Sequence, residues 1–155
     1  MVWAGITQNG RTPLIFVPEG VKINAQVYRE MILEGCLKPW ATSHFGTDPW
    51  TFQQDSAPAH REKTTITWLE ENVPAFITPS EWPPYSPDLK PMDFSIWSIL
   101  ESKFCCIRQP SVEVLKRRLT YEWNQIPQEV LRTSCENFIK RLGLVISARG
   151  GHIER

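Results

Sequence analysis

The sequence predicts a mixed α/β domain, and three features carry that prediction. Two β-rich runs, at residues 1–7 and 12–17, are joined by a turn that contains Asn9 and Gly10, a pair typical of a tight hairpin. Short β-rich runs then alternate with helical periodicity, and helical periodicity alone fills the last third of the chain. With 155 residues, 41% of them hydrophobic, the chain is long enough for one domain with a sizeable core.

The predicted elements follow the order ββαβαβααα. After the hairpin, a helix is expected from Asn24, its cap, to about His44. A short strand at 50–54 precedes a helix over 57–73, and another short strand is expected at 75–78. A helix is expected to begin with Asp93 at its N-cap and to end near residue 104. Two more helices follow, with core-facing stripes at Val112, Leu115, Leu119 and Trp123 on the first and at Val130, Leu131, Cys135, Phe138, Leu142 and Val145 on the second.

A proline-rich segment separates the last predicted strand from Asp93. The stretch "PSEWPPYSPDLKPMD" holds five prolines in fifteen residues. Because proline fixes φ and removes a backbone donor, we expect an ordered loop here, not a helix or a central strand.

Composition excludes several classes of protein. No apolar run reaches membrane-spanning length, and no basic segment followed by an apolar one marks a signal peptide. The four cysteines, Cys36, Cys105, Cys106 and Cys135, show no C-x-x-C spacing. They predict reduced thiols in the cytosol or nucleus, not a zinc site or a disulfide framework.

Charge is unevenly distributed along the chain. Residues 1–100 hold 7 basic and 11 acidic side chains, a net of −4, whereas residues 101–155 hold 10 and 6, a net of +4. Lys116, Arg117 and Arg118 form the densest basic run, and Lys140 and Arg141 form a second one. These residues are candidate DNA contacts, and the alternative is a solvated helix face.

Two aspartates are candidate metal ligands. Asp55, in "FQQDSAPAH", closes a predicted strand, and Asp93 opens a predicted helix, with 37 residues between them. The intervening helix, strand and loop can return Asp93 to the sheet edge where Asp55 ends, and ligand sites gather at such edges. Two carboxylates facing one point suit Mg²⁺ or Mn²⁺. The alternative is a plain strand-end residue and a plain helix cap.

The sequence segments around these aspartates resemble motifs of a known family. "QQDSAPAH" and "WPPYSPDLKPMDFSIW" resemble the second and third acidic motifs of Tc1/mariner-type transposases, which belong to the DDE/D superfamily. "MVWAGIT", "GVKINAQVYREMIL", "IPQEVL" and "GGH" are also similar to that family's catalytic domain. The resemblance covers essentially the whole chain and implies an RNase H-like mixed sheet flanked by helices.

The resemblance assigns roles to individual residues. Asp55 would be the second catalytic acid and Asp93 the third, together holding Mg²⁺ or Mn²⁺, while Asp88 in "SPDL" would only cap a turn. His60, one helical turn beyond Asp55, could orient a carboxylate or touch a phosphate; the alternative is a structural histidine. Lys90 stands where relatives often have asparagine.

The resemblance also implies parts that lie upstream of this chain. The first acid is expected on a central strand before "MVWAGIT", and an N-terminal helix-turn-helix region is expected before that. We therefore expect residues 1–155 to be a partial catalytic domain, N-terminally truncated, with an incomplete acidic triad. Such a chain is expected to be inactive by itself and unstable in isolation.

The implied function is that of a DNA transposase. The parent protein would cleave phosphodiester bonds at transposon ends and transfer the strand to target DNA, as a homodimer, in the nucleus. Two alternatives stay open: a non-catalytic, transposase-derived remnant that binds DNA or protein, and an RNase H-like nuclease of another kind.

Overall fold

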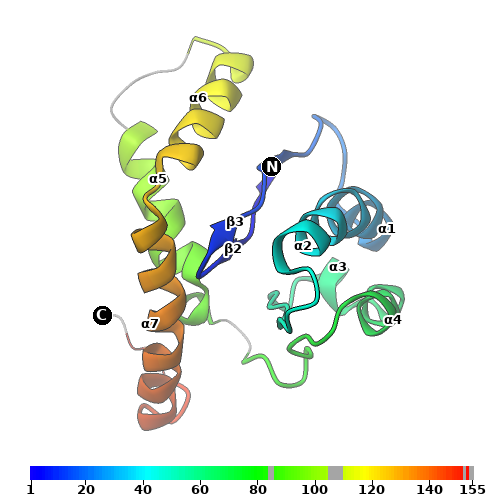
Figure 1. The fold of residues 1–155 in the computed structure, drawn as a ribbon, viewed down its shortest axis with the longest axis vertical. Coiled ribbons are helices and arrows are strands. Elements are labelled where there is room, and N and C mark those ends of the chain that lie inside the picture. The colour runs from blue at the N-terminus through cyan, green and yellow to red at the C-terminus, as the bar shows by residue number, and fades with distance from the viewer. Residues whose placement is uncertain (84–85, 105–109, 152, 154–155) are drawn as a thin grey trace. The chain divides into compact units, whose positions relative to one another are not determined.

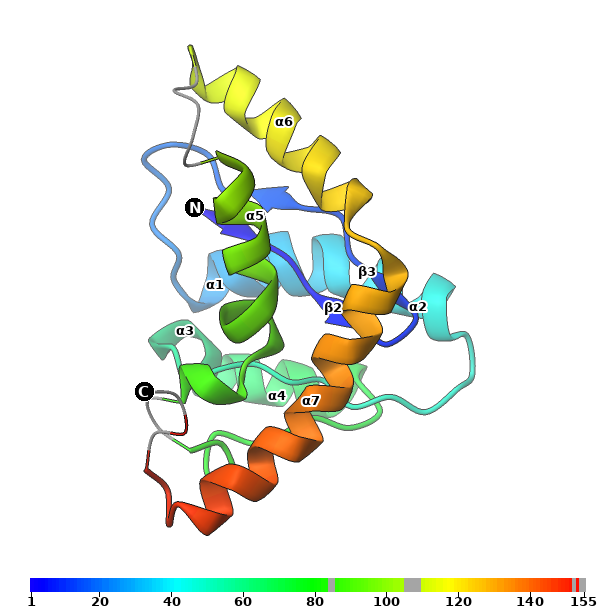
Figure 2. The same cartoon turned by 90° about the vertical axis from the view of Figure 1, so that its left-hand side faces the viewer.

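A computed structural model describes residues 1–83, 86–104, 110–151 and 153 of the chain (Figures 1 and 2). The chain forms two compact units: Met1–Trp3 with Val17–Pro84, and Ala4–Phe16 with Tyr85–Arg155. Within the described residues, no helix combines the length and the apolar character needed to cross a bilayer.

The first unit is mainly helical. Its elements are β1 (Val2–Trp3), α1 (Ala25–Val27), the π-helix η1 (Tyr28–Leu37), α2 (Lys38–Phe45), α3 (Pro58–Arg61) and α4 (Lys63–Asn72). The predicted helix from Asn24 is confirmed, and Asn24 caps it by accepting the backbone N–H of Val27 at 2.9 Å. Its middle turns are π-helical and include Gly35. A Cβ on Gly35 would meet the carbonyl oxygen of Glu30 at 3.1 Å, so glycine suits this position.

The strand that leads to Asp55 is shorter than predicted. In the described residues it is a single parallel bridge between Phe52 and Phe76. Phe52 donates its N–H to the carbonyl of Ala75 at 2.8 Å and accepts the N–H of Ile77 at 3.0 Å. This bridge anchors the chain three residues before Asp55. The buried apolar residues of the first unit are Val17, Tyr28, Ile32, Leu33, Cys36, Leu37, Ala41, Phe52, Trp68, Leu69 and Trp82.

The second unit contains the hairpin and the C-terminal helices. Its elements are β2 (Ile6–Thr7), β3 (Gly10–Arg11), β4 (Ile15–Phe16), the 3₁₀ turn η2 (Pro87–Leu89), the π-helix η3 (Met92–Ile96), α5 (Trp97–Phe104), α6 (Val112–Gln125) and α7 (Gln128–Ser147). In the figures, η3 and α5 run beside α7 and α6 (Figures 1 and 2). The predicted hairpin is present, with Thr7 paired to Gly10. Its turn is therefore Gln8–Asn9, one residue earlier than the Asn9–Gly10 signal suggested, and the Thr7 hydroxyl accepts the N–H of Asn9 at 3.3 Å.

The core of the second unit confirms part of the predicted apolar stripes. Ile96, Leu100, Trp123, Ile126 and Leu131 form its buried cluster. On α6, the predicted stripe is wrong at its start: Val112 is 64% exposed and Leu115 is also exposed. On α7, a serine that apolar periodicity cannot find, Ser134, is buried with Leu131.

Two of the four cysteines lie in the described residues, and both are free thiols. Cys36 is buried and Cys135 half-buried. Burial raises the pKa of both thiols, and the charge of Glu136 helps to raise that of Cys135 to about 11. Both are therefore protonated at neutral pH, as expected for inert thiols. Cys105 and Cys106 lie outside the described residues.

Candidate functional site

Asp55 follows the Phe52 bridge and lies where the chain turns into α3. Its Oδ1 accepts the backbone N–H of Ala57 at 2.9 Å, which makes an aspartate turn. Pro58 then starts α3 with its φ already fixed. The Asp55 side chain is 33% exposed. The local sequence thus fixes one oxygen of the Asp55 carboxylate by a hydrogen bond and leaves part of the side chain exposed to solvent.

His60 contacts the same carboxylate oxygen. Its Nδ1 lies 2.6 Å from Asp55 Oδ1, and the centroid of its ring lies 4.2 Å from the centroid of the Tyr28 ring. Tyr28 is only 1% exposed and donates its hydroxyl to Gln54 Oε1 at 2.8 Å, while Gln54 Nε2 donates to the His60 carbonyl at 3.3 Å. Tyr28 and Gln54 therefore fix His60, and His60 fixes Asp55.

Sequence reasoning found His60 but missed Tyr28. Tyr28 lies far from Asp55 along the chain, and its position in a predicted helix is that of an ordinary buried residue. No local signal therefore indicated that it lies near Asp55. Burial and the negative charge of Asp55 both raise the pKa of the Tyr28 phenol well above its usual value. The phenol therefore remains a hydrogen-bond donor throughout the neutral range.

The raised pKa predicts how stability depends on pH. Folding favours the protonated phenol, so this stability is complete below the unfolded-state pKa of about 10 and is lost as the pH rises above it. At pH 8, we expect Tyr28→Phe to be less stable than wild type by about 0.5–1.5 kcal/mol, the net value of one hydrogen bond. Above pH 10, wild type loses about 1.4 kcal/mol per pH unit relative to the variant. The difference should vanish near pH 11.

Urea unfolding at pH 8, 10 and 11 measures this difference. The effects of the cysteines cancel, because both proteins carry them. A difference that stays constant across this range would show that Tyr28 titrates alike in the folded and unfolded chains.

Asp93 is not the helix cap that the sequence predicted. The N-cap of η3 is Pro91, and Asp93 is the second residue inside the helix. The correction has a physical reason: the backbone N–H of Asp93 already bonds to the carbonyl of Lys90 at 2.9 Å, so the helical turn has begun before it. The Asp93 carboxylate is 34% exposed and lies 3.1 Å from Lys90 Nζ. It is thus available at the surface and balanced by one ammonium group. The turn itself is π-helical, a form that is frequent at functional sites.

The two aspartates fit a divalent cation by their chemistry. Asp55 belongs to the first unit and Asp93 to the second, so their predicted approach to one another remains a prediction. Each offers a partly exposed carboxylate, the hard oxygen ligand that Mg²⁺ and Mn²⁺ prefer. The ammonium group of Lys90 already lies beside the Asp93 carboxylate, at the place where a bound cation would replace it. Neither here nor at any other place in the described part of the chain do three or more His, Cys, Asp or Glu side chains gather in one group.

Lys90 is expected to weaken cation binding at Asp93. Replacing it by asparagine removes a competing charge worth about 0.2–1 kcal/mol at a partly exposed site. We expect Lys90→Asn to tighten Mn²⁺ binding by up to about five-fold in calorimetric titration. Lys22→Asn, at an exposed loop position of the first unit, is the control and should leave the affinity unchanged. Equal affinities of wild type and Lys90→Asn would mean that Asp93 does not bind the metal.

Asp88 is engaged with the C-terminal segment. Its Oδ2 accepts the backbone N–H of Ile153 at 3.2 Å, and its carbonyl accepts Nη1 of Arg141 at 3.2 Å. Asp88 lies inside η2 and bonds to residues far along the chain, so its turn-capping role stays a prediction. Sequence spacing offers no signal for such contacts.

Most of the first basic run makes contacts within the second unit. Lys116 pairs with Glu113 at 2.9 Å, and its Nζ lies 6.0 Å from the Phe16 ring. Arg118 donates to the carbonyl of Lys103 at 3.3 Å. Arg117 lies on the exposed face of α6. Of the three candidate DNA contacts in this run, Arg117 is thus the most accessible.

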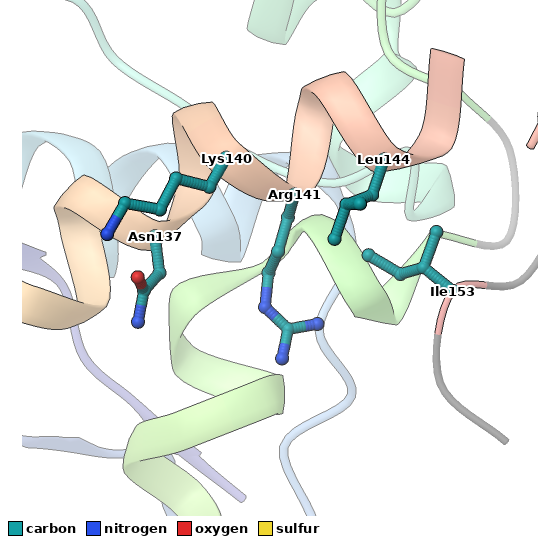
Figure 3. Close-up of a pocket in the computed structure, with 5 residues that line it drawn as sticks. All are labelled: Asn137, Lys140, Arg141, Leu144 and Ile153. Atoms are coloured by element: carbon teal, nitrogen blue, oxygen red, sulfur yellow. The ribbon is translucent and has the colours of Figure 1, made fainter. Parts of the chain in front are cut away.

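The second basic pair borders an open groove of about 310 Å³ on α7 (Figure 3). Asn137, Lys140, Arg141, Leu144 and Ile153 line it. Lys140 is exposed and extends along α7, whereas the Arg141 guanidinium turns toward the neighbouring helix (Figure 3). There Arg141 Cζ lies 3.9 Å from the centroid of the Phe94 ring. The two adjacent cations therefore face different surroundings.

Comparison with curated proteins finds transposases. The chain is 31% identical to the Tcb1 transposase of Caenorhabditis briggsae over 150 residues, which is 97% of this chain and 52% of that protein. It is 28% identical to the Tc3 transposase of Caenorhabditis elegans over 155 residues, 99% of this chain and 45% of that protein. The chain thus spans about half the length of the curated relatives it matches. No family model matches it.

Comparison with solved structures identifies the fold. The catalytic domain of Mos1 mariner transposase matches with a TM-score of 0.83 at 21% identity, covering 99% of this chain and 74% of that one. A Mos1 mariner paired-end complex with Mn matches with a TM-score of 0.86 at 21% identity, covering 99% and 44%. The Mos1 catalytic domain has also been solved with raltegravir and Mg, at a TM-score of 0.84, 20% identity and coverage of 99% and 75%. The predicted RNase H-like α/β fold is thereby confirmed. The chain is a homologue of the Tc1/mariner transposases and has the fold of their catalytic domain.

Proposed function

We propose that this chain supplies the second and third acids of a metal-dependent DNA transposase. A transposase that contains this chain would cleave phosphodiester bonds at transposon ends and join the freed 3′-hydroxyl to target DNA. The observation that carries the proposal is the site at Asp55, whose carboxylate is oriented by His60 and by the N–H of Ala57. That site lies in a chain that matches transposases along nearly its whole length.

The residues of the chain would divide the work between binding and orientation. Asp55 and Asp93 would hold Mg²⁺ or Mn²⁺ through their carboxylate oxygens. A bound divalent metal supplies Lewis acidity and lowers the pKa of a water molecule that attacks phosphorus. His60 keeps the Asp55 carboxylate in one orientation, so little rearrangement is needed when the cation enters. Lys90, which now pairs with Asp93, would be free to face a phosphate when Asp93 holds the cation.

DNA is the proposed partner, in the form of transposon ends and target. Arg117 and Lys140 are the exposed members of the two basic runs, and they would neutralise backbone phosphates in a salt-dependent way. The Mos1 transposase has been solved in a paired-end complex with a transposon end, which supports a homodimer here as part of the proposal. A nuclear location is proposed with it, because that is where chromosomal DNA lies in a eukaryotic cell.

A chimeric transposase tests the function. Residues 1–155 replace the matching segment of the Tcb1 transposase, and excision of an element with Tcb1 ends is measured in Mn²⁺. We expect excision, and we expect Asp55→Asn or Asp93→Asn to abolish it. Asp88→Asn is the matched control, because it makes the same chemical change at an aspartate bound to the C-terminal segment, and excision should persist.

Two outcomes would count against the proposal. A chimera that folds and binds the transposon ends but does not cleave them would support the alternative of a non-catalytic remnant. Cleavage that is indifferent to Asp55 would place the chemistry elsewhere. Residues 1–155 alone are expected not to nick such DNA above the level of an Asp55→Asn control, because the resemblance places the first acid of the triad outside them.

A further inference from the structure

We propose that α7 positions Asp93, and that Arg141 serves this purpose instead of binding a DNA phosphate. The inference rests on the proposed function, since it takes Asp93 to be a metal ligand. Phe94 and Ser95, the two residues that follow Asp93, both contact side chains of α7.

Arg141 holds Phe94 by stacking. The guanidinium carbon lies 3.9 Å from the centroid of the Phe94 ring, well inside the range of about 6 Å for a cation–π contact. Nη1 also donates to the backbone carbonyl of Asp88 at 3.2 Å, in the loop that leads to η3. The planar guanidinium is thus used on its face and at its edge, a combination that lysine cannot reproduce. Figure 3 shows this side chain turned away from Lys140, which extends along α7.

Ser134 holds Ser95 by a hydrogen bond. Ser134 is 3% exposed, and its hydroxyl donates to the carbonyl of Val130 at 2.7 Å. A hydroxyl has one proton, so Ser134 Oγ must accept from the Ser95 hydroxyl, which lies 2.8 Å away. Leaving a buried polar group without its partner costs more than the bond is worth, so this contact fixes η3 on α7.

The two contacts act together because of helix geometry. Ser134 and Arg141 are seven residues apart, two turns along one face of α7. They contact consecutive residues of η3, and the N–H groups of Asp93 and Phe94 both bond to the carbonyl of Lys90, at 2.9 and 3.0 Å. Rotation of the Asp93 backbone would therefore break several contacts at once.

The end of α7 adds a further contact. The chain reverses at Arg149 and Gly150, whose φ angles of 52° and 84° are left-handed, and the backbone N–H of Ile153 then reaches Asp88 Oδ2. The loop before Asp93 is thus held by the C-terminal segment as well as by Arg141.

Two adjacent cations provide a matched experiment on the 155-residue chain. Arg141→Lys keeps the charge but loses the stacked plane, whereas Lys140→Ala removes an exposed charge and leaves the stack. We expect Arg141→Lys to weaken Mn²⁺ binding about tenfold, the lower end for residues that orient a ligand. It should also speed amide hydrogen exchange at Asp93 and Phe94 by about tenfold or more, with little change in DNA affinity at low salt. Lys140→Ala should lower DNA affinity and leave the Mn²⁺ affinity and the amide exchange rates unchanged.

A second variant guards against simple misfolding of Arg141→Lys. Phe94→Leu removes the stacking partner and leaves the Arg141 charge in place. We expect it to reproduce the losses in Mn²⁺ affinity and amide protection while retaining the wild-type DNA affinity. The double variant should lose about as much Mn²⁺ affinity and amide protection as either single variant, because both substitutions break the same contact.

The results separate this inference from the proposed function. If wild type binds no Mn²⁺, the proposed function fails, and the exchange rates at Asp93 and Phe94 still decide the role of α7. Unchanged exchange in both Arg141→Lys and Phe94→Leu would overturn the inference. A loss of DNA affinity in Arg141→Lys equal to that in Lys140→Ala would show instead that Arg141 binds phosphate.

Discussion

Asp55→Asn is expected to remove most of the affinity of this chain for Mn²⁺. The substitution keeps the shape of the side chain and its acceptor for the N–H of Ala57, but removes the negative charge that His60 orients. Residues that merely orient a ligand cost about 10- to 100-fold in metal affinity when replaced, so the loss of the ligand itself should be at least as large. Calorimetric titration with Mn²⁺ measures it.

Asp88→Asn is the matched control for this titration. It makes the same chemical change at an aspartate whose carboxylate accepts the N–H of Ile153, and an amide oxygen can still accept that bond. We expect an affinity within about twofold of wild type, which corresponds to about 0.3–0.5 kcal/mol, the usual additivity error for independent sites. If Asp55→Asn and Asp88→Asn have equal affinities, Asp55 is a plain turn residue, the alternative that its spacing left open.

Trp123→Ala is expected to have the largest effect on stability. Trp123 is 1% exposed at the centre of the buried cluster of the second unit, and its indole N–H donates to the carbonyl of Thr12 at 2.9 Å. Arg11, in the hairpin strand β3, donates to the backbone carbonyls of Trp123 and Ile126. These bonds anchor β3 on the end of α6. Truncation of a buried tryptophan to alanine costs about 3–5 kcal/mol, against a total of about 5–15 kcal/mol for a domain.

Chemical denaturation of the two proteins measures this loss. Tyr121→Ala, two residues earlier on α6, is the control: Tyr121 is 62% exposed, and its replacement should change the free energy of unfolding by less than about 0.5 kcal/mol. Similar losses for the two variants would mean that α6 does not pack through Trp123.

Local sequence signals predicted much of this architecture. Asn24 caps its helix because an amide after an irregular segment can accept the N–H three residues on. The hairpin and the helices α6 and α7 follow from turn chemistry and apolar periodicity. Asp55 lies at a turn, as its small and rigid neighbours indicated.

Other features depend on contacts that no local pattern encodes. The π-helical form of η1 and η3 has no local signal in the sequence, and Asp93 is inside its helix because its N–H already bonds to the carbonyl of Lys90. Tyr28 reaches Gln54 through packing between distant segments. Arg141 looked like a DNA contact because charge is visible in the sequence, whereas its stacking on Phe94 becomes visible only in the fold.

In the proposed function, Asp55 and Asp93 bind one metal ion together, and paramagnetic broadening by Mn²⁺ can test this pairing. The amide resonances of the 155-residue chain are assigned, and substoichiometric Mn²⁺ is added. We predict that broadening is strongest at the amides next to both Asp55 and Asp93, and that Asp55→Asn removes it from the neighbours of both residues. Broadening confined to one of them, or broadening near Asp93 that survives Asp55→Asn, would contradict a shared metal site.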